Sequence, residues 1–341
     1  MDTSKLVDLV EASDFDGLIR FIDGVCGARD WPGLVETRDR CVAAETRGKQ
    51  LFGVVRFAEY RLALEAPGEM AASVLRDGAG RFALGPLWEV AASTHEWAEL
   101  GPHLESPRMR ALVGAERALR GEDLEDAGLD QEVLGLPFSM QEWEPRYPLA
   151  VYRSDVADFP SPESPTLQDA ELPSPPGRLE DLDSEEALYA LVRPWAEESN
   201  GITDVTSAEG PALGAVALLT DAPVTAHEAS FAEALAHMAW AGASGGAHGS
   251  RRGSPVGRSL AWAVVAALAD LESVDPAEVG DAGQALHWML WRPARAASGW
   301  GLHLAVEDPR AGYAWAIQAF DKRDDFFNSD KGVGLGSPGI T

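Results

Sequence analysis

Apolar residues return every three or four positions through the first third of the chain, which is the spacing of amphipathic helices. One such face lies at 18–25, and similar faces follow at 51–62 and 87–97, with short Gly and Pro breaks between them. Consecutive helical hairpins that cannot bury both faces alone tend to stack into a solenoid. We therefore predict a helical-repeat-like domain over residues 1–123, solenoid-like or, since no repeat period is visible, an irregular bundle.

Residues 124–182 differ in amino-acid composition from the segments on either side and are predicted to join two domains. Six prolines lie between Pro160 and Pro176, among many acidic residues. This segment has too few apolar side chains to offset its ordering entropy, so we predict an extended linker with polyproline character. The strip before it, 136–155, contains aromatic side chains such as Phe138 and Trp143 that are unfavourable in water. We expect this strip to dock on a domain surface.

The last third alternates helical and strand-like patterns, which predicts a smaller α+β domain over residues 183–326. A helix is expected at 184–199, interrupted or kinked at Pro194, where the chain lacks a backbone donor. A strand at 202–208 and a helix around 211–219 follow. The whole chain is thus predicted to be mainly α.

Two further helix starts are read from capping residues in this domain. Thr225 with Glu228 three residues later fits a capping box that opens a helix ending near Ala243. Ser254 and Pro255 supply an N-cap and a favoured first helical residue for a helix that is apolar nearly all round. Such a helix belongs in the centre of a domain.

The segments "LHWMLWRP" and "SGWGLHLAVEDP" alternate as a β-hairpin does. Placing Leu290 opposite Trp300 gives one wholly apolar face, so we predict that register. The same register sets His287 opposite His303. Because no third ligand is evident, we interpret these histidines as a packed or hydrogen-bonded pair rather than a metal site. A final helix is expected after Pro309, and then a flexible tail at 327–341.

The charge of the chain restricts its possible partners. The formal net charge is −27 over 341 residues. This excess repels phosphate backbones and anionic lipid surfaces, so nucleic-acid and membrane binding are not expected, while a basic protein is favoured as partner. Solubility is the simpler explanation of the same charge. No secretory signal or segment of ~20 apolar residues is present, and we expect a cytoplasmic protein.

The stretch "ASGGAHGSRRGSPVGRS" interrupts this acidic chain with glycines and basic residues. Backbone amides at a helix start, helped by arginines, suit a phosphate, sulfate or carboxylate. The loop 244–258 is therefore a candidate anion site, with candidate ligands listed in chain order as His248, Ser250, Arg251, Arg252, Ser254 and Arg258. The pattern matches neither a P-loop nor a dinucleotide fingerprint. A structural reading, in which the glycines permit close packing and the arginines pair with internal carboxylates, is favoured.

Searches for other chemistry leave the catalytic residues unknown. The sequence contains no G-x-S-x-G, no H-E-x-x-H and no repeated C-x-x-C motif. Cys26 and Cys41, the two cysteines, lie on predicted core faces and indicate neither a disulfide framework nor a zinc site. We predict no cofactor and no metal.

Several blocks of the chain, including "LWEVAASTHEWAEL", "QEWEPRYPLAVYR", "WAGASGGAHGSRRGSPVGR" and "GWGLHLAVEDPRAGYAWAI", resemble a family of actinobacterial proteins without assigned function. The resemblance spans most of the chain. It implies no catalytic residues.

Two classes of function therefore remain. The first is a non-enzymatic interaction module whose acidic helical surface binds a basic protein. The alternative is an enzyme or ligand-binding protein that uses the loop 244–258 as an anion or phosphate site. The two differ in whether Arg251, Arg252 and His248 converge on a pocket or pair with internal carboxylates.

Overall fold

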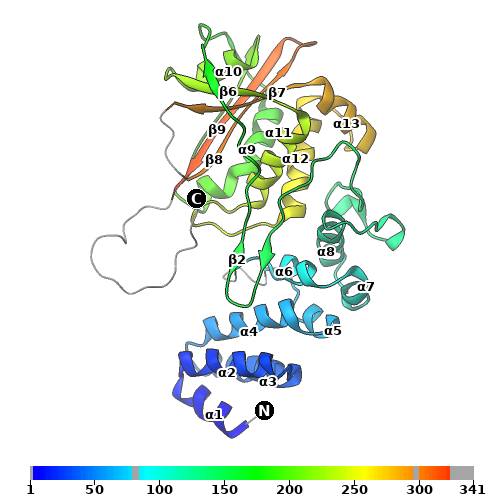
Figure 1. The fold of residues 1–341 in the computed structure, drawn as a ribbon, viewed down its shortest axis with the longest axis vertical. Coiled ribbons are helices and arrows are strands. Elements are labelled where there is room, and N and C mark those ends of the chain that lie inside the picture. The colour runs from blue at the N-terminus through cyan, green and yellow to red at the C-terminus, as the bar shows by residue number, and fades with distance from the viewer. Residues whose placement is uncertain (1–2, 79–83, 295–298, 323–341) are drawn as a thin grey trace, which may run out of the picture.

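The computed structural model describes residues 3–78, 84–294 and 299–322 of the chain. Helices stack at the amino-terminal end, and a twisted sheet with its own helices forms the other end (Figure 1). Each end has a separate large hydrophobic core. The tail predicted at 327–341 lies outside the described ranges.

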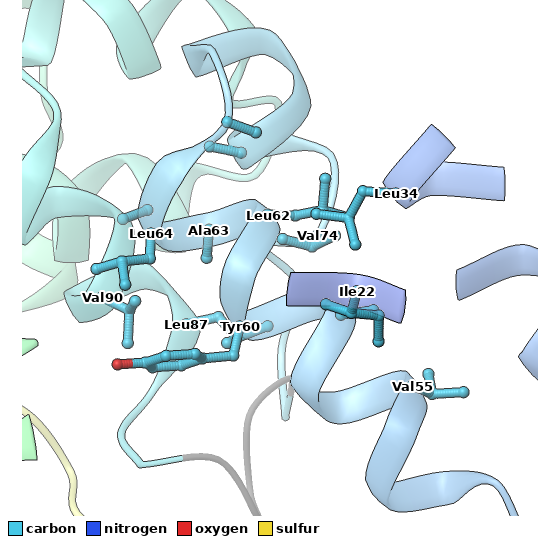
Figure 2. Close-up of a cluster of buried hydrophobic side chains, with 14 of the residues drawn as sticks. Ile22, Leu34, Val55, Tyr60, Leu62, Ala63, Leu64, Val74, Leu87 and Val90 are labelled. Atoms are coloured by element: carbon cyan, nitrogen blue, oxygen red, sulfur yellow. The ribbon is translucent and has the colours of Figure 1, made fainter. Parts of the chain in front are cut away.

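The amino-terminal part is helical, as predicted. Within the described residues its helices are α1 (Thr3–Ala12), α2 (Phe15–Gly27), α3 (Trp31–Glu45), α4 (Phe52–Glu65), α5 (Gly68–Ala72), α6 (Leu87–Thr94), α7 (Trp97–Leu100), η1 (Gly101–His103) and α8 (Pro107–Leu119). Helices α1, α2 and α3 pack on one another, α4 covers α2 and α3, and α6 links α4 to α8 (Figure 1). Aliphatic side chains of α2, α3, α4 and α6 meet in a shared core (Figure 2).

Local signals placed several of these helices correctly. Asp30 accepts a hydrogen bond from the Gly33 amide, which caps α3 as its sequence pattern indicates. Cys26 and Cys41 are buried in helices, and burial raises the pKa of each thiol to about 11. Both side chains therefore act as small core residues.

The strip at 136–155 lies against both ends of the molecule. Phe138 is buried beside α8, and Tyr147 and Tyr152 are buried farther along. The turns η2 (Glu125–Ala127) and η3 (Gln131–Val133) precede the strip, and its last part contains β1 (Val151–Tyr152), which pairs with β2 (Ala157–Asp158) in a two-stranded ribbon. Tyr147 packs in one of the two large cores and Tyr152 in the other.

The proline-rich segment is not only a linker, because it contributes two short strands to the main sheet. β3 (Gln168–Ala170) pairs with one edge of the sheet and β4 (Arg178–Leu179) with the opposite edge. Residues 171–177 connect these two edges, and Pro176 lies against Gly214. Pairing with edge strands gives this polar segment the backbone hydrogen bonds that its few apolar side chains could not replace.

The main sheet has seven antiparallel strands in the order β3-β6-β7-β8-β9-β5-β4. The remaining strands are β5 (Ile202–Glu209), β6 (Val224–Ala229), β7 (His287–Pro293), β8 (Trp300–Asp308) and β9 (Tyr313–Asp321). Helix α10 (Ala212–Leu219) covers one face. Helices α9 (Leu182–Glu197) and α11 (Phe231–Ala243) cover the other, and α13 (Pro276–Ala285) flanks them.

Helix α12 (Ser254–Leu268) is central, as its uniformly apolar sequence predicts. It packs on α9, α11 and α13, and also contacts α8 of the amino-terminal part. Gly257 permits the close approach to α11, because a Cβ atom there would lie 2.0 Å from the Ala239 carbonyl oxygen. Helix α12 is therefore the element through which the two parts of the molecule meet.

The predicted helix start at Thr225 is wrong. These residues belong to β6, and the capping box that opens α11 is formed by Ser230 and Glu233. Both pairs have the same spacing and chemistry. Pairing of β6 with β3 and β7 decides which of them begins the helix.

The predicted hairpin exists, but its register is shifted by four residues. Leu290 lies opposite Leu304 rather than Trp300, and His287 lies opposite Glu307. The shift is even, so the apolar face of the hairpin is preserved while the histidine pair is lost. His303 instead contacts the Trp291 ring, and burial lowers the pKa of its imidazole to about 4.

The final helix predicted after Pro309 is also wrong, since "YAWAIQAF" forms β9. This strand lies between β8 and β5 and is buried on both faces. A strand covered on both sides loses the polar and apolar alternation that would identify it.

Candidate functional site

The loop singled out by the sequence, residues 244–253, connects α11 to α12 and is called the junction loop here. Gly246 and Gly253 have φ values of +74° and +96°, which other residues rarely adopt. A Cβ atom at Gly253 would also lie 2.3 Å from the Trp88 ring. The glycines therefore serve backbone conformation and close packing, as the structural reading requires.

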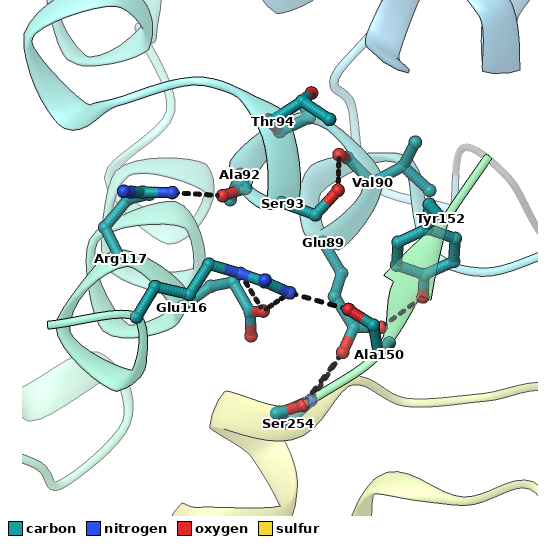
Figure 3. Close-up of polar contacts among 12 residues, drawn as sticks. Glu89, Val90, Ala92, Ser93, Thr94, Glu116, Arg117, Ala150, Tyr152 and Ser254 are labelled. Carbon is teal, nitrogen blue, oxygen red and sulfur yellow. Dashed lines mark hydrogen bonds and ion pairs between the residues drawn. The ribbon is translucent and has the colours of Figure 1, made fainter. Parts of the chain in front are cut away.

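Arg251 reaches from the junction loop to Glu89 on α6. Its Nε and Nη2 atoms donate to the two carboxylate oxygens at 2.8 and 2.7 Å. Ser254 donates to the same carboxylate from its amide and its hydroxyl, both at 3.0 Å, and the Tyr152 hydroxyl donates at 2.6 Å (Figure 3). Glu89 is completely buried, so this cluster joins the two parts of the molecule through fully desolvated groups.

The electrostatics of this cluster favour an ion pair. Burial alone would raise the pKa of Glu89, but the Arg251 charge and the hydrogen bonds outweigh it and hold the pKa below its usual value. The Arg251 guanidinium also lies over the Phe159 ring, 4.8 Å from its centroid. Glu89 thus acts as the internal anion for Arg251.

A second buried carboxylate, Glu116 on α8, lies near Glu89 (Figure 3). Arg120 donates to one Glu116 oxygen at 2.9 Å and to the Ala150 carbonyl oxygen at 2.9 Å. The other carboxylate oxygen, Oε2, is buried without a hydrogen-bond partner. Burial, reinforced by the neighbouring Glu89 charge, raises the pKa of Glu116 to about 8. Glu116 therefore holds a proton at neutral pH.

Arg252 does not contact Glu89 and instead donates hydrogen bonds to backbone carbonyl groups of α9. It donates to the carbonyl oxygen of Ala190 at 3.0 Å and to that of Leu191. Pro194 lies four residues after Ala190 and has no amide hydrogen to donate to it, so the arginine supplies the missing donor. Burial lowers the pKa of Arg252 to about 10, which leaves it charged at neutral pH.

Arg258 on α12 forms a third, separate contact. Its Nε donates to Glu144 at 2.7 Å and its Nη2 at 2.5 Å, and both side chains are completely buried. Two further donors reach the same carboxylate, the Tyr147 hydroxyl at 2.8 Å and the Trp262 indole at 3.1 Å. Arg258 also donates to carbonyl oxygens of the strip at 136–155. This pair fixes the strip on α12.

Of the remaining predicted ligands, His248 lies apart from these groups. The side chain of His248 is exposed, and its amide donates to the Ser199 hydroxyl at 3.1 Å. Ser250 is half-buried. The cavity beside Arg251 and Ser254 has a volume of about 10 Å³, which is room for a single water molecule. The geometry therefore favours pairing of the arginines with internal partners over convergence on an anion.

A thermal melt distinguishes the two readings. We expect phosphate, added at constant ionic strength, to leave the unfolding midpoint unchanged. We expect replacement of Arg251 and Arg252 by glutamine to lower the free energy of unfolding by about 2 kcal/mol, because buried acceptors lose charged donors. An anion site would instead give stabilisation of about 2.7 kcal/mol at a hundred times the dissociation constant, and the double variant would abolish it.

Sequence reasoning did not find the carboxylates that receive these arginines. Glu144 lies in the strip predicted to dock, and Glu89 follows Leu87 by two positions, which places it on the side of α6 opposite the apolar face predicted at 87–97. The helical spacing therefore predicts an exposed Glu89 and gives no signal of its burial. Among the described residues, no group of three or more His, Cys, Asp or Glu side chains is placed to hold a metal ion.

One comparison with known proteins decides the family. A family described as "Family of unknown function (DUF6183)" matches residues 16–322. The chain belongs to this family. The match agrees with the resemblance to proteins without assigned function, and the actinobacterial origin stays a prediction. Comparisons of this DUF6183 member with curated proteins and with solved structures found no significant match.

Proposed function

We propose that this DUF6183 protein is a non-enzymatic interaction module that binds a basic protein partner. The observation that carries the proposal is the uneven distribution of charge. Residues 124–183 contain fourteen acidic residues and three arginines. Twelve of these fourteen acidic side chains are exposed, whereas Glu144 and Asp181 are partly or fully buried and hydrogen-bonded. Such a surface attracts a basic partner over a long range.

The helices of the amino-terminal part contribute less to the net negative charge. Residues 1–123 contain 21 acidic and 15 basic residues, so their charge is nearly balanced. Many of these charges face each other, as in the pairs Arg47–Glu11 and Arg61–Glu65. We therefore propose an acidic surface on residues 124–183 and the α+β part, in place of the acidic helical surface expected from the sequence. We interpret the stacked helices α1–α4 as a solenoid-like scaffold beside it.

The alternative function, an enzyme or ligand-binding protein using the loop 244–258, receives less support. Arg251 and Arg258 form ion pairs with separate buried carboxylates, and Arg252 donates hydrogen bonds to the backbone of α9. Within the described ranges no helix combines the length and apolarity needed to cross a membrane. A cytoplasmic location remains our prediction.

Salt dependence of binding tests the proposal. Immobilised full-length protein is exposed to a lysate of the native cell, and each retained protein is then purified and its affinity measured at several salt concentrations. We expect basic partners whose affinity falls as ionic strength rises, because exposed charges are screened beyond ~10 Å at 0.1 M salt. Retention of only neutral or acidic proteins, or an affinity insensitive to salt, would contradict the proposal.

A further inference from the structure

A groove with a volume of about 530 Å³ lies between the start of α9 and the first residues of β9. Residues 179–183 form one wall, and Tyr313 and Trp315 of β9 form the other. The volume falls within the range of sites that hold small molecules or single side chains.

The apolar surface of this groove is unusually exposed. Leu182 is 73% exposed and Tyr313 is 44% exposed, and Leu182 has the largest exposed fraction among the large hydrophobic residues described as exposed. Trp315 is 4% exposed, and its indole donates to Asp181 at 2.8 Å. The groove therefore combines a fixed floor with two apolar side chains that are available to a partner.

Acidic side chains surround this apolar surface. Glu180 and Asp183 line the groove and are exposed. Glu209 and Asp308 lie directly opposite Tyr313 on the neighbouring strands, so they share its face of the sheet. Asp308 accepts hydrogen bonds from the amides of the following turn, but Glu209 is exposed.

Helix capping explains only part of this charge. Asp181 accepts a hydrogen bond from the Ser184 amide and caps α9, and Asp183 lies in the first turn, where the helix dipole favours an acid. Glu180 precedes the helix, and Glu209 and Tyr313 belong to strands. The nearest arginine along the chain, Arg178, is 3.5 Å from Glu185 instead. In the described structure, Glu180 and Asp183 have no ion pair with a lysine or arginine.

We propose that this groove binds an arginine or lysine side chain of the basic partner. The aliphatic stem would lie against Leu182 and the floor, and the charged head would lie between the Tyr313 ring and the carboxylates. An aromatic face attracts a cation, and a carboxylate rim adds hydrogen bonds and charge. This inference rests on the proposed function and names its point of recognition.

Binding of fluorescein-labelled hexa-arginine and hexa-lysine peptides, followed by fluorescence anisotropy at low salt, tests the groove. We expect the double variant Glu180→Gln/Asp183→Asn to raise the dissociation constant about tenfold, since both carboxylates that attract the bound cation lose their charge. The matched control, Glu272→Gln/Asp281→Asn, removes two exposed acids elsewhere and should change the constant less than about twofold. Thermal melts of both variants verify that they fold.

The aromatic contribution is tested separately. We expect Tyr313→Ala to weaken peptide binding about threefold, whereas Tyr313→Phe, which keeps the ring face, should retain it. Equal effects of the groove and control double variants, or no peptide binding by the parent protein, would overturn the groove inference. If the groove variant still captures a basic partner with parent affinity, the groove is refuted and the proposed function survives. If the parent protein captures no basic partner, the proposed function fails.

Discussion

Replacing Arg258 with methionine is expected to reduce the free energy of unfolding by about 3–5 kcal/mol. The substitution keeps most of the apolar volume but leaves the Glu144 carboxylate buried without its counter-charge. Urea denaturation monitored by tryptophan fluorescence measures the effect. An Arg310→Met variant, which changes an exposed arginine, is the control and should lie within about 0.5 kcal/mol of the parent.

A double-mutant cycle shows whether the loss comes from the pair. Glu144→Gln removes the charge but keeps an acceptor for Tyr147 and Trp262. We expect the Arg258→Met/Glu144→Gln variant to be more stable than the sum of the single effects predicts, because the buried charge is then gone. Simple additivity would show that Arg258 acts through packing alone.

Replacing Glu116 with glutamine is expected to stabilise the protein at neutral pH by on the order of 3 kcal/mol. The folded-state pKa of Glu116 is about 8, above its usual value of 4.5. Between these values the folded protein keeps a proton that the unfolded chain releases, so stability falls as pH rises from about 5 to about 8. Glutamine resembles the protonated form and does not titrate, which removes this part of the pH dependence.

Chemical denaturation of the parent and of Glu116→Gln between pH 5 and pH 8.5 checks this expectation. The stability difference should be small near pH 5 and should grow with pH. The exposed Glu272→Gln variant is the control and should show no such trend. A constant difference between parent and variant across this range would show that Glu116 is ionised throughout.

Sequence reasoning succeeded where the local chain alone decides the structure. The capped start of α3 and the central helix α12 follow from short-range patterns, whereas α9 is one helix that includes Pro194. It failed where neighbours in space decide. The alanine-rich β9 looks helical because both of its faces are covered, and the hairpin register depends on strands that are distant in sequence.

The candidate site also combines features that the local sequence predicts with contacts that only the fold creates. The sequence located the arginines and glycines of the junction loop and favoured internal pairing for them. It could not say which carboxylates receive them, because Glu89 precedes Arg251 by 162 residues and Glu144 precedes Arg258 by 114. The groove beside α9 was missed because Glu180 and Tyr313 meet only through the fold.

Residues 171–177 join the two outermost strands of the seven-stranded sheet. Short edge strands protect a sheet from pairing with other chains, and here both protective strands belong to one continuous segment. A single proteolytic cut within it would free one end of each border strand, so that only two or three residue pairs on each side would still cover β6 and β5. The covering of both sheet edges therefore depends on one seven-residue stretch of chain.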